Sequence, residues 1–221
     1  MARSLVQVES GYPDPPPMNQ REIVLGLRGG AAVLMVASFE QFLKELVSEC
    51  LDLIQSNGKV NYDLLPERIR IQNTYGLLEP AMKGVGRAQR NSTKGDRLSD
   101  IITACLAIGG KKLQSTAFIE TGSNPNKRRV VEMMKHLDIV DVFTAIRPRF
   151  EREWGSHVST TFIPDKLDEI VSRRNEVAHT GQSLTISRKD LRDSLKYLRV
   201  LGKVLDIEVH QKCRLIASTS R

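Results

Sequence analysis

The sequence is poor in the residues that build disulfide scaffolds and base-stacking surfaces. Its 221 residues include three cysteines, one Trp, four Tyr and six Phe. Cys50, Cys105 and Cys213 are odd in number, far apart and without a Cys-x-x-Cys pair. They predict reduced core or surface thiols in a cytoplasmic protein, not a disulfide framework. The scarcity of aromatic side chains argues against a surface that stacks on exposed bases.

Metal and nucleotide signatures are also missing. His136, His157 and His210 lack the spacing of metal ligands, and Glu132 with His136 forms a single i, i+4 pair without a third ligand. No stretch reads Gly-x-x-x-x-Gly-Lys-Ser/Thr, which excludes a P-loop triphosphatase. We therefore expect neither a metal site nor a cofactor.

Long apolar runs and strand patterns are scarce as well. No uninterrupted apolar run approaches the roughly 18 to 20 residues that cross a bilayer, and no secretory segment precedes Gln7. We expect a soluble, cytoplasmic protein without a membrane partner. A hydrophobic content of 40% is enough for a real core, and the near absence of alternating patterns predicts an all-α fold.

Positive charge is abundant. The 33 Lys and Arg exceed the 26 Asp and Glu, for a net charge of +7. Such a surface attracts polyanions, so RNA is the first candidate partner, although many basic proteins bind no nucleic acid. Near the motif described below, the candidates for contact with an RNA backbone are Arg173, Lys127, Arg128 and Arg129. Further basic clusters are Lys111-Lys112, Arg147 with Arg149 and Arg152, and Arg188-Lys189 with Arg192.

The chain begins with a proline-rich stretch and continues with helical patterns. Residues 1–20 contain Pro13 and Pro15 to Pro17 and predict an extended arm, not a helix. Residues 21–55 place apolar side chains at i, i+3 and i+4, which predicts a long amphipathic helix. Its three glycines, Gly26, Gly29 and Gly30, suggest that another helix crosses there.

The remaining helices are expected from the same periodicity. Helical patterns cover residues 65–82, 97–106, 127–137, 140–154 and, after Pro164, 167–180. Ser187 and Asp190 form a capping box that opens a last long helix. We expect an all-α bundle with long first and last helices and a helical insertion between them. Residues 21–215 would form one domain, and residues 216–221 a flexible tail.

The sequence Arg174-Asn175-Glu176-Val177-Ala178-His179 carries the chemistry. Arginine keeps its charge and offers a planar fork of donors to phosphate, and histidine exchanges protons near neutrality. In a helix, Asn175 and His179 lie one turn apart on one face, with Arg174 about 100° from Asn175. Arg174 and Ala178 share the spacing of the apolar face, so Arg174 is expected to point toward packed surface. The simpler interpretation is a helix end with a surface Arg, a capping Asn and an ordinary His.

Three stretches resemble the HEPN domains, in particular the branch associated with RiboL-PSP modules. The first helix runs from Leu27 through small residues to Phe39-Glu40-Gln41-Phe42. The second stretch is Ser123-Asn124-Pro125-Asn126 followed by a helix over residues 130–139. The third is Arg174-Asn175-x-x-x-His179 in the penultimate long helix. The likeness covers residues 21–213.

The resemblance implies a metal-independent endoribonuclease that acts as a homodimer with a composite site. Carried onto this chain, it makes Arg174 and His179 catalytic and Asn175 an orienting residue. The 2′-hydroxyl would attack the adjacent phosphorus and give 2′,3′-cyclic phosphate and 5′-hydroxyl ends, so DNA would not be cut. It also implies a toxin or antiviral defence effector with an antitoxin or regulatory partner.

Two points of the resemblance stay open. Glu40 is a candidate for a supporting position near the motif, and equally a solvated carboxylate that pairs with Lys44. Gly181 stands where toxin relatives have a Tyr two residues after the His, which argues against regulation by adenylylation of that Tyr. The alternative function is a non-catalytic HEPN-like module that binds a protein or nucleotide, for example as partner of a nucleotidyltransferase.

Overall fold

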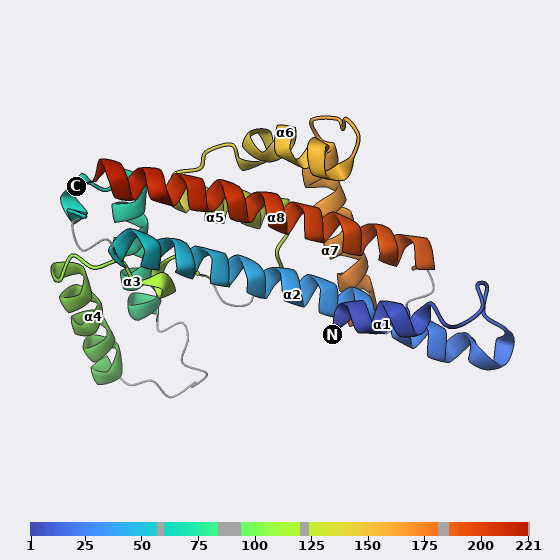
Figure 1. Ribbon diagram of the computed structural model, residues 1–221. Helices are drawn as coiled ribbons and strands as arrows, with labels where there is room; N and C mark the ends of the chain where they lie inside the picture. Colours follow the sequence, from blue (N-terminus) through green and yellow to red (C-terminus); the bar gives the residue numbers. More distant parts are fainter. Residues whose placement is uncertain (57–59, 84–93, 120–123, 181–185, 221) are drawn as a thin grey trace. The chain divides into compact units, whose positions relative to one another are not determined.

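The computed structural model describes residues 1–56, 60–83, 94–119, 124–180 and 186–220, and within these ranges it is all-α (Figure 1). This confirms the predicted fold class. The described elements, none of them a strand, are α1 (Ala2–Glu9), η1 (Met18–Gln20), α2 (Arg21–Ser56), η2 (Tyr62–Leu64), α3 (Glu67–Lys83), α4 (Lys94–Gly109), η3 (Ser115–Ala117), α5 (Lys127–His136), α6 (Val142–Trp154), α7 (Phe162–Thr180) and α8 (Arg188–Thr219).

The chain divides into two compact units. Unit 1 consists of Met1–Leu43, Ser123–Val131 and Asp141–Glu208, and unit 2 of Lys44–Gly122, Glu132–Val140 and Val209–Arg221. The long helices α2 and α8 contribute residues to both units. All residues of the Arg-Asn-x-x-x-His motif belong to unit 1.

Hydrophobic periodicity located the helices well. The observed α2 spans Arg21–Ser56, against a predicted 21–55, and α3 to α6 begin and end within a few residues of the expected bounds. The capping box is also confirmed. Ser187 Oγ accepts from the backbone N–H of Asp190 at 3.1 Å, and Asp190 Oδ2 accepts from the backbone N–H of Ser187 at 3.0 Å. These bonds satisfy donors at the start of α8.

The expectation of an extended arm over residues 1–20 is wrong for its first half, because residues 2–9 form α1. The cause is a long-range ion-pair network in unit 1. Glu9 is fully buried, and its carboxylate lies 2.7 Å from Arg28 Nη2 and 2.9 Å from Arg188 Nε. Arg28 also pairs with Asp14 at 3.0 Å. A buried carboxylate between two arginines ties α1 to α2 and to the start of α8.

Gly30 of α2 meets a neighbouring helix, whereas Gly26 does not. A Cβ added at Gly30 would lie 3.6 Å from Leu5 Cδ1 of α1, whereas one at Gly26 would have no atom within 4 Å. The crossing element near Gly30 is therefore α1, which the sequence did not predict as a helix.

Aromatic side chains pack the part of unit 1 that carries α6 to α8. The rings of Phe150, Trp154, Phe162 and Tyr197 have centroids 5.7 to 6.4 Å apart. The hydroxyl of buried Tyr197 donates to the carbonyl of Ile163, so its polar end is satisfied. This cluster anchors the first turn of α7 to α8 and fixes the helix that bears the motif.

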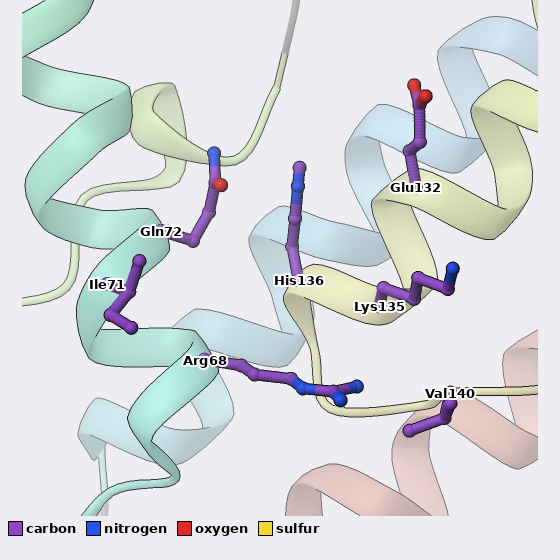
Figure 2. A pocket seen from close by; sticks show the side chains of 7 residues that line it. All are labelled: Arg68, Ile71, Gln72, Glu132, Lys135, His136 and Val140. Carbon is purple, nitrogen blue, oxygen red and sulfur yellow. The ribbon is translucent and has the colours of Figure 1, made fainter.

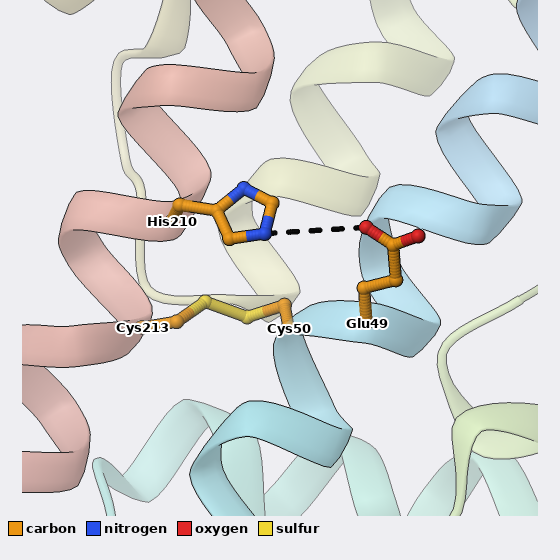
Figure 3. The surroundings of a disulfide bond; sticks show 4 residues. All are labelled: Glu49, Cys50, His210 and Cys213. Carbon is orange, nitrogen blue, oxygen red and sulfur yellow. Dashed lines mark ion pairs between the residues drawn. A yellow bond between two sulfur atoms is a disulfide. The ribbon is translucent and has the colours of Figure 1, made fainter.

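The expectation of reduced thiols is wrong for two cysteines of unit 2. Cys50 of α2 and Cys213 of α8 form a disulfide with a Cα–Cα distance of 5.8 Å, although 163 positions separate them (Figure 3). Both lie on buried helix faces. His210 Nε2 lies 4.0 Å from Glu49 Oε2 beside the disulfide. Cys105 is an exposed free thiol. The spacing of the cysteines gave no signal because helix packing, not sequence proximity, brings the pair together.

The expected flexible tail over residues 216–221 is also wrong through residue 220. Helix α8 extends to Thr219, and Ile216 and Ala217 are 3% exposed. The carbonyl of Ser220 accepts from the backbone N–H of Asn61 at 2.7 Å, and the Ser220 hydroxyl donates to the Leu64 carbonyl at 3.2 Å. The end of α8 is therefore part of unit 2.

Helix α3 approaches the η3 turn closely within unit 2. A Cβ added at Gly76 would lie 2.0 Å from the carbonyl oxygen of Ala117. Gln72 Nε2, one turn earlier, donates to the same oxygen at 2.7 Å. Only glycine leaves room for this contact.

The segment Met18–Ser56, which includes α2, meets the length and hydropathy criteria of a membrane-spanning helix. An 18-residue window within it has a mean hydropathy of 1.6, and 44% of that window is buried inside the fold. Length and composition alone would let such a helix cross a bilayer. The core helix of a water-soluble fold passes the same test, so this is weak support for a span.

Candidate functional site

The motif lies in the last two turns of α7 (Phe162–Thr180), which starts earlier than the pattern predicted and includes Pro164 in its first turn. Proline is tolerated there because the first helical N–H groups have no partner within the helix. Leu167, Ile170 and Val171 are buried on one face. Arg174 continues this face and is half-buried, as expected. Ala178 was expected on the same face but is exposed, because the buried surface ends one turn earlier.

Arg174 is held by two carboxamides. Its Nη1 donates to Asn124 Oδ1 at 2.9 Å and to Asn175 Oδ1 at 3.1 Å. Arg174 Nε is buried and has no hydrogen-bond partner among the described residues. Both acceptors are neutral, so they orient the guanidinium without compensating its charge. Asn175 thus contacts Arg174 directly, in agreement with an orienting position.

Asn124 belongs to the Asn-Pro-Asn turn that precedes α5. Asn126, two residues later, accepts from the backbone N–H of Arg129 at 2.9 Å and so caps the start of α5. Asp168 of α7 accepts from the backbone N–H of Lys127 at 2.8 Å. The turn is therefore fixed to α7 at two places, at Asp168, nearly two helical turns before the motif, and at Arg174 within it.

Lys127, a predicted RNA contact, reaches toward two carboxylates of α7. Its Nζ lies 3.1 Å from Asp165 Oδ1 and 3.4 Å from Asp168 Oδ2. Hydrogen bonds to Asp165 and then Asp168 raise the pKa of Lys127, and the bond from Lys127 lowers the pKa of Asp165. All three side chains are at least a third exposed, so the pairs are weak.

Arg173, another expected RNA contact, is compensated by two carboxylates. It lies 2.7 Å from Glu169 Oε1, one turn earlier, and 2.8 Å from Asp190 Oδ1 at the start of α8. Burial alone would raise the pKa of Asp190, but hydrogen bonds from Ser187 and Arg173 outweigh it and lower the pKa. The side chain of Arg173 therefore joins α7 to α8.

The other basic candidates divide between surface and interior. Arg128 is exposed, whereas Arg129 is only 8% exposed and therefore faces the packed side of α5. Glu40, the supporting candidate on α2, is half-buried in unit 1. Of the four residues expected to meet an RNA backbone, Lys127 and Arg128 are exposed, Arg173 is half-buried and Arg129 is buried.

His179 lies in the last turn of α7 and is exposed, and Asn175, one turn before it, is half-buried. The end of α7 thus presents an exposed imidazole and an oriented guanidinium that has no carboxylate partner among the described residues. These two groups can stabilise charge on a phosphate and transfer protons.

A separate hollow in unit 2 also contains a guanidinium and an imidazole, those of Arg68 and His136, but no residue of the motif. It has a volume of about 380 Å³ and lies between α3 and α5 (Figure 2). Figure 2 shows Arg68 extending from α3 toward the end of α5 that carries His136. No group of three His, Cys, Asp or Glu side chains that could hold a metal ion occurs in the described parts of the chain.

The sequence did not reveal the partner of Arg174. The Asn-Pro-Asn turn was recognised as a family-like feature, but its spacing to the motif, 50 positions, carries no pattern. The same holds for Asp190, which was expected only as a cap and also pairs with Arg173.

An all-α fold with Arg-Asn-x-x-x-His at the end of a long helix, joined to an Asn-Pro-Asn turn, defines a HEPN-type domain. The family model for RiboL-PSP-HEPN matches residues 4–211. The chain belongs to the RiboL-PSP-HEPN family, which points to an RNA-related, nuclease-like role. No curated protein and no solved structure matched the chain in the corresponding searches.

Proposed function

We propose that the chain is a metal-independent endoribonuclease whose active groups are Arg174, Asn175 and His179. The observation that carries the proposal is the environment of Arg174. Its guanidinium is half-buried, oriented at 2.9 Å by Asn124 and at 3.1 Å by Asn175, and paired with no carboxylate among the described residues. A fixed cation with uncompensated charge is what a phosphate in a transition state requires.

The reaction follows from these groups. The ribose 2′-oxygen attacks the adjacent phosphorus and forms a new P–O bond as the bond to the 5′-oxygen breaks. A base accepts the 2′-hydroxyl proton, an acid protonates the leaving 5′-oxygen, and Arg174 stabilises charge on the phosphate oxygens. His179 transfers protons, and Asn175 orients Arg174. The products are a 2′,3′-cyclic phosphate and a 5′-hydroxyl.

Two protons move at opposite sides of the phosphorus, so the reaction needs an acid and a base together. One chain offers a single histidine in the motif. We therefore assign the site to a homodimer in which the α7 ends of two copies meet and supply two copies of His179. The exposure of His179 at the helix end leaves it accessible to such a partner.

Expression in a bacterial host separates this enzyme from a HEPN-like interaction module. Wild type should arrest growth, and Arg174→Ala or His179→Ala should relieve the arrest at equal protein level. Loss of an acid or base costs about a hundred to ten thousand fold in rate, and loss of a group that stabilises transition-state charge is also severe. Arg68→Ala, which changes an exposed arginine of unit 2 outside the motif, is the control and should still arrest growth. Equal tolerance of wild type and both motif variants would favour the interaction module.

The dimer has a separate test. Specific activity measured over a dilution series should fall as the protein dissociates to monomers. The protein concentration at which half the activity is lost should equal the concentration at which light scattering shows half of the dimer dissociated. Full activity in a monomer would contradict the composite site, but it would not contradict the assignment of Arg174, Asn175 and His179.

A further inference from the structure

The outward face of α8 in unit 1 carries only cations at its exposed positions. From Leu191 to Lys203 the exposed residues are Arg192, Lys196, Arg199 and Lys203. We call these four residues the α8 basic stripe. Their spacing of four, three and four places them in one row along the helix. The opposite face packs the core with Leu191, Ser194, Tyr197, Leu198 and Leu201.

This row is unlike an ordinary solvated helix face. Such faces mix both signs, and like charges at i, i+4 destabilise a helix. Arg192 with Lys196 and Arg199 with Lys203 are two such like-charged pairs. A row of cations that weakens its own helix is best explained by an anionic partner.

The stripe also lines a groove. Arg192, Lys196, Arg199 and Lys203 surround a groove of about 460 Å³ together with Leu195, Val200 and Glu153. Four cations thus face a single carboxylate. Glu153 Oε2 lies 2.7 Å from Lys203 Nζ, but both partners are solvent-exposed and such a pair opens readily.

Lys196 is pre-positioned in this groove. Its Nζ lies 4.3 Å from the centroid of the Trp154 ring and donates to the Trp154 carbonyl at 3.3 Å. The contact with the ring holds the ammonium group in place while leaving its charge uncompensated. An ammonium held this way loses less conformational freedom when an anion binds.

We infer that the α8 basic stripe binds the phosphate backbone of RNA. The stripe spans about 16 Å of helix, because eleven residues each rise about 1.5 Å. This length is enough for several consecutive phosphates of an RNA strand. The inference rests on the proposed function for the choice of RNA as the polyanion, and it assigns a binding surface outside the motif.

The test uses an RNA that the proposed reaction cannot cut. A fluorescently labelled 2′-O-methyl RNA lacks the attacking hydroxyl, so its binding is measured by anisotropy whether or not the chain is an RNase. Wild type is compared with Arg192→Gln/Lys196→Gln/Arg199→Gln/Lys203→Gln. The matched control, Arg68→Gln/Lys111→Gln/Lys112→Gln/Lys135→Gln, removes four exposed cations of unit 2.

The stripe variant should bind on the order of ten- to a hundredfold more weakly at 100 mM salt, and its log–log salt slope should fall by about 2 to 3, at about 0.7 per lost phosphate contact. The control should change the affinity less than about threefold. Lys196→Arg/Lys203→Arg, which keeps the charges, should bind like wild type. In wild type, bound RNA should protect Lys196 and Lys203 from acetylation while Lys111 and Lys112 stay reactive.

Four results would each overturn the inference. They are no RNA binding by wild type, binding by the stripe variant equal to that of wild type, equal weakening in both quadruple variants, and Lys196 and Lys203 that stay reactive in the complex. If RNA binds independently of the stripe, the remaining candidate partner of the stripe is an acidic protein surface. Cleavage of unmodified RNA is scored separately. If RNA binding depends on the stripe but unmodified RNA is not cut, the proposed RNase activity is wrong and the stripe inference stands. If unmodified RNA is cut but binding does not depend on the stripe, the stripe inference is wrong and the RNase proposal stands.

Discussion

Arg174 Nη1 donates to Asn124 Oδ1 at 2.9 Å, which joins the motif helix to the turn before α5. The neighbouring Arg173 is bound to two carboxylates, Glu169 and Asp190. Adjacent arginines of one helix thus have opposite environments. The charge of Arg173 is compensated by carboxylates, whereas the partners of Arg174 among the described residues are the neutral amides of Asn124 and Asn175.

This relationship predicts the effect of Asn124→Asp. The new carboxylate has nearly the shape of the amide and would form a charge-assisted pair with Arg174. The guanidinium would then stabilise a phosphate less well, and the rate of RNA cleavage should fall about ten- to a hundredfold. The unfolding temperature should not fall, because the contact is retained.

Asn126→Asp is the matched control, since it makes the same change two residues later. Asn126 caps α5, where Asp serves as well as Asn. Cleavage and unfolding temperature should both match wild type. Wild-type activity in Asn124→Asp would show that the neutral partner of Arg174 is unimportant.

The buried Glu9 predicts a stability effect in unit 1. Glu9→Gln would leave Arg28 and Arg188, whose side chains are 7% and 15% exposed, without their shared carboxylate. The free energy of unfolding in denaturant should fall by about 3 kcal/mol, the lower end for a broken buried pair, since Asp14 still contacts Arg28. Asp52→Asn changes an exposed carboxylate of α2 and should cost less than about 0.5 kcal/mol. Equal effects of the two substitutions would refute the network.

Two glycines in helices predict opposite outcomes for the same substitution. Gly76→Ala should lower the free energy of unfolding by about 1 to 3 kcal/mol, because the new methyl group meets the backbone of Ala117. Gly26→Ala has open space and should raise it by up to about 1 kcal/mol, since Ala favours the helix. Thermal unfolding of both variants measures the difference. A stable Gly76→Ala protein would contradict the close approach of α3 and η3.

Most of the secondary structure followed from the sequence. Helices α2 and α8 have core faces repeated over many turns, so periodicity located them within a few residues. The Ser187 and Asp190 cap needed only local chemistry. The motif at the end of α7 was recognisable because its three polar residues stand at fixed helical spacing.

The parts that the sequence did not show depend on contacts between distant residues. Prolines follow α1 closely in the chain, so the local pattern did not predict a helix. The helix is held by contacts of Glu9 with Arg28, 19 positions away, and with Arg188, 179 positions away. The Cys50–Cys213 disulfide and the Arg174–Asn124 bond likewise join positions that no short pattern relates. Each depends on tertiary packing, which local propensity does not encode.

The most direct test of the proposed function is RNA cleavage by the purified protein in EDTA, with chemical identification of the fragment ends. Wild type should produce 2′,3′-cyclic phosphate and 5′-hydroxyl ends and should leave DNA of the same sequence intact. His179→Ala should be at least about a hundredfold slower while its circular dichroism and unfolding temperature match wild type. Fragments with 5′-phosphate ends, cleavage that EDTA abolishes, or equal rates in wild type and His179→Ala would contradict the assignment of Arg174 and His179.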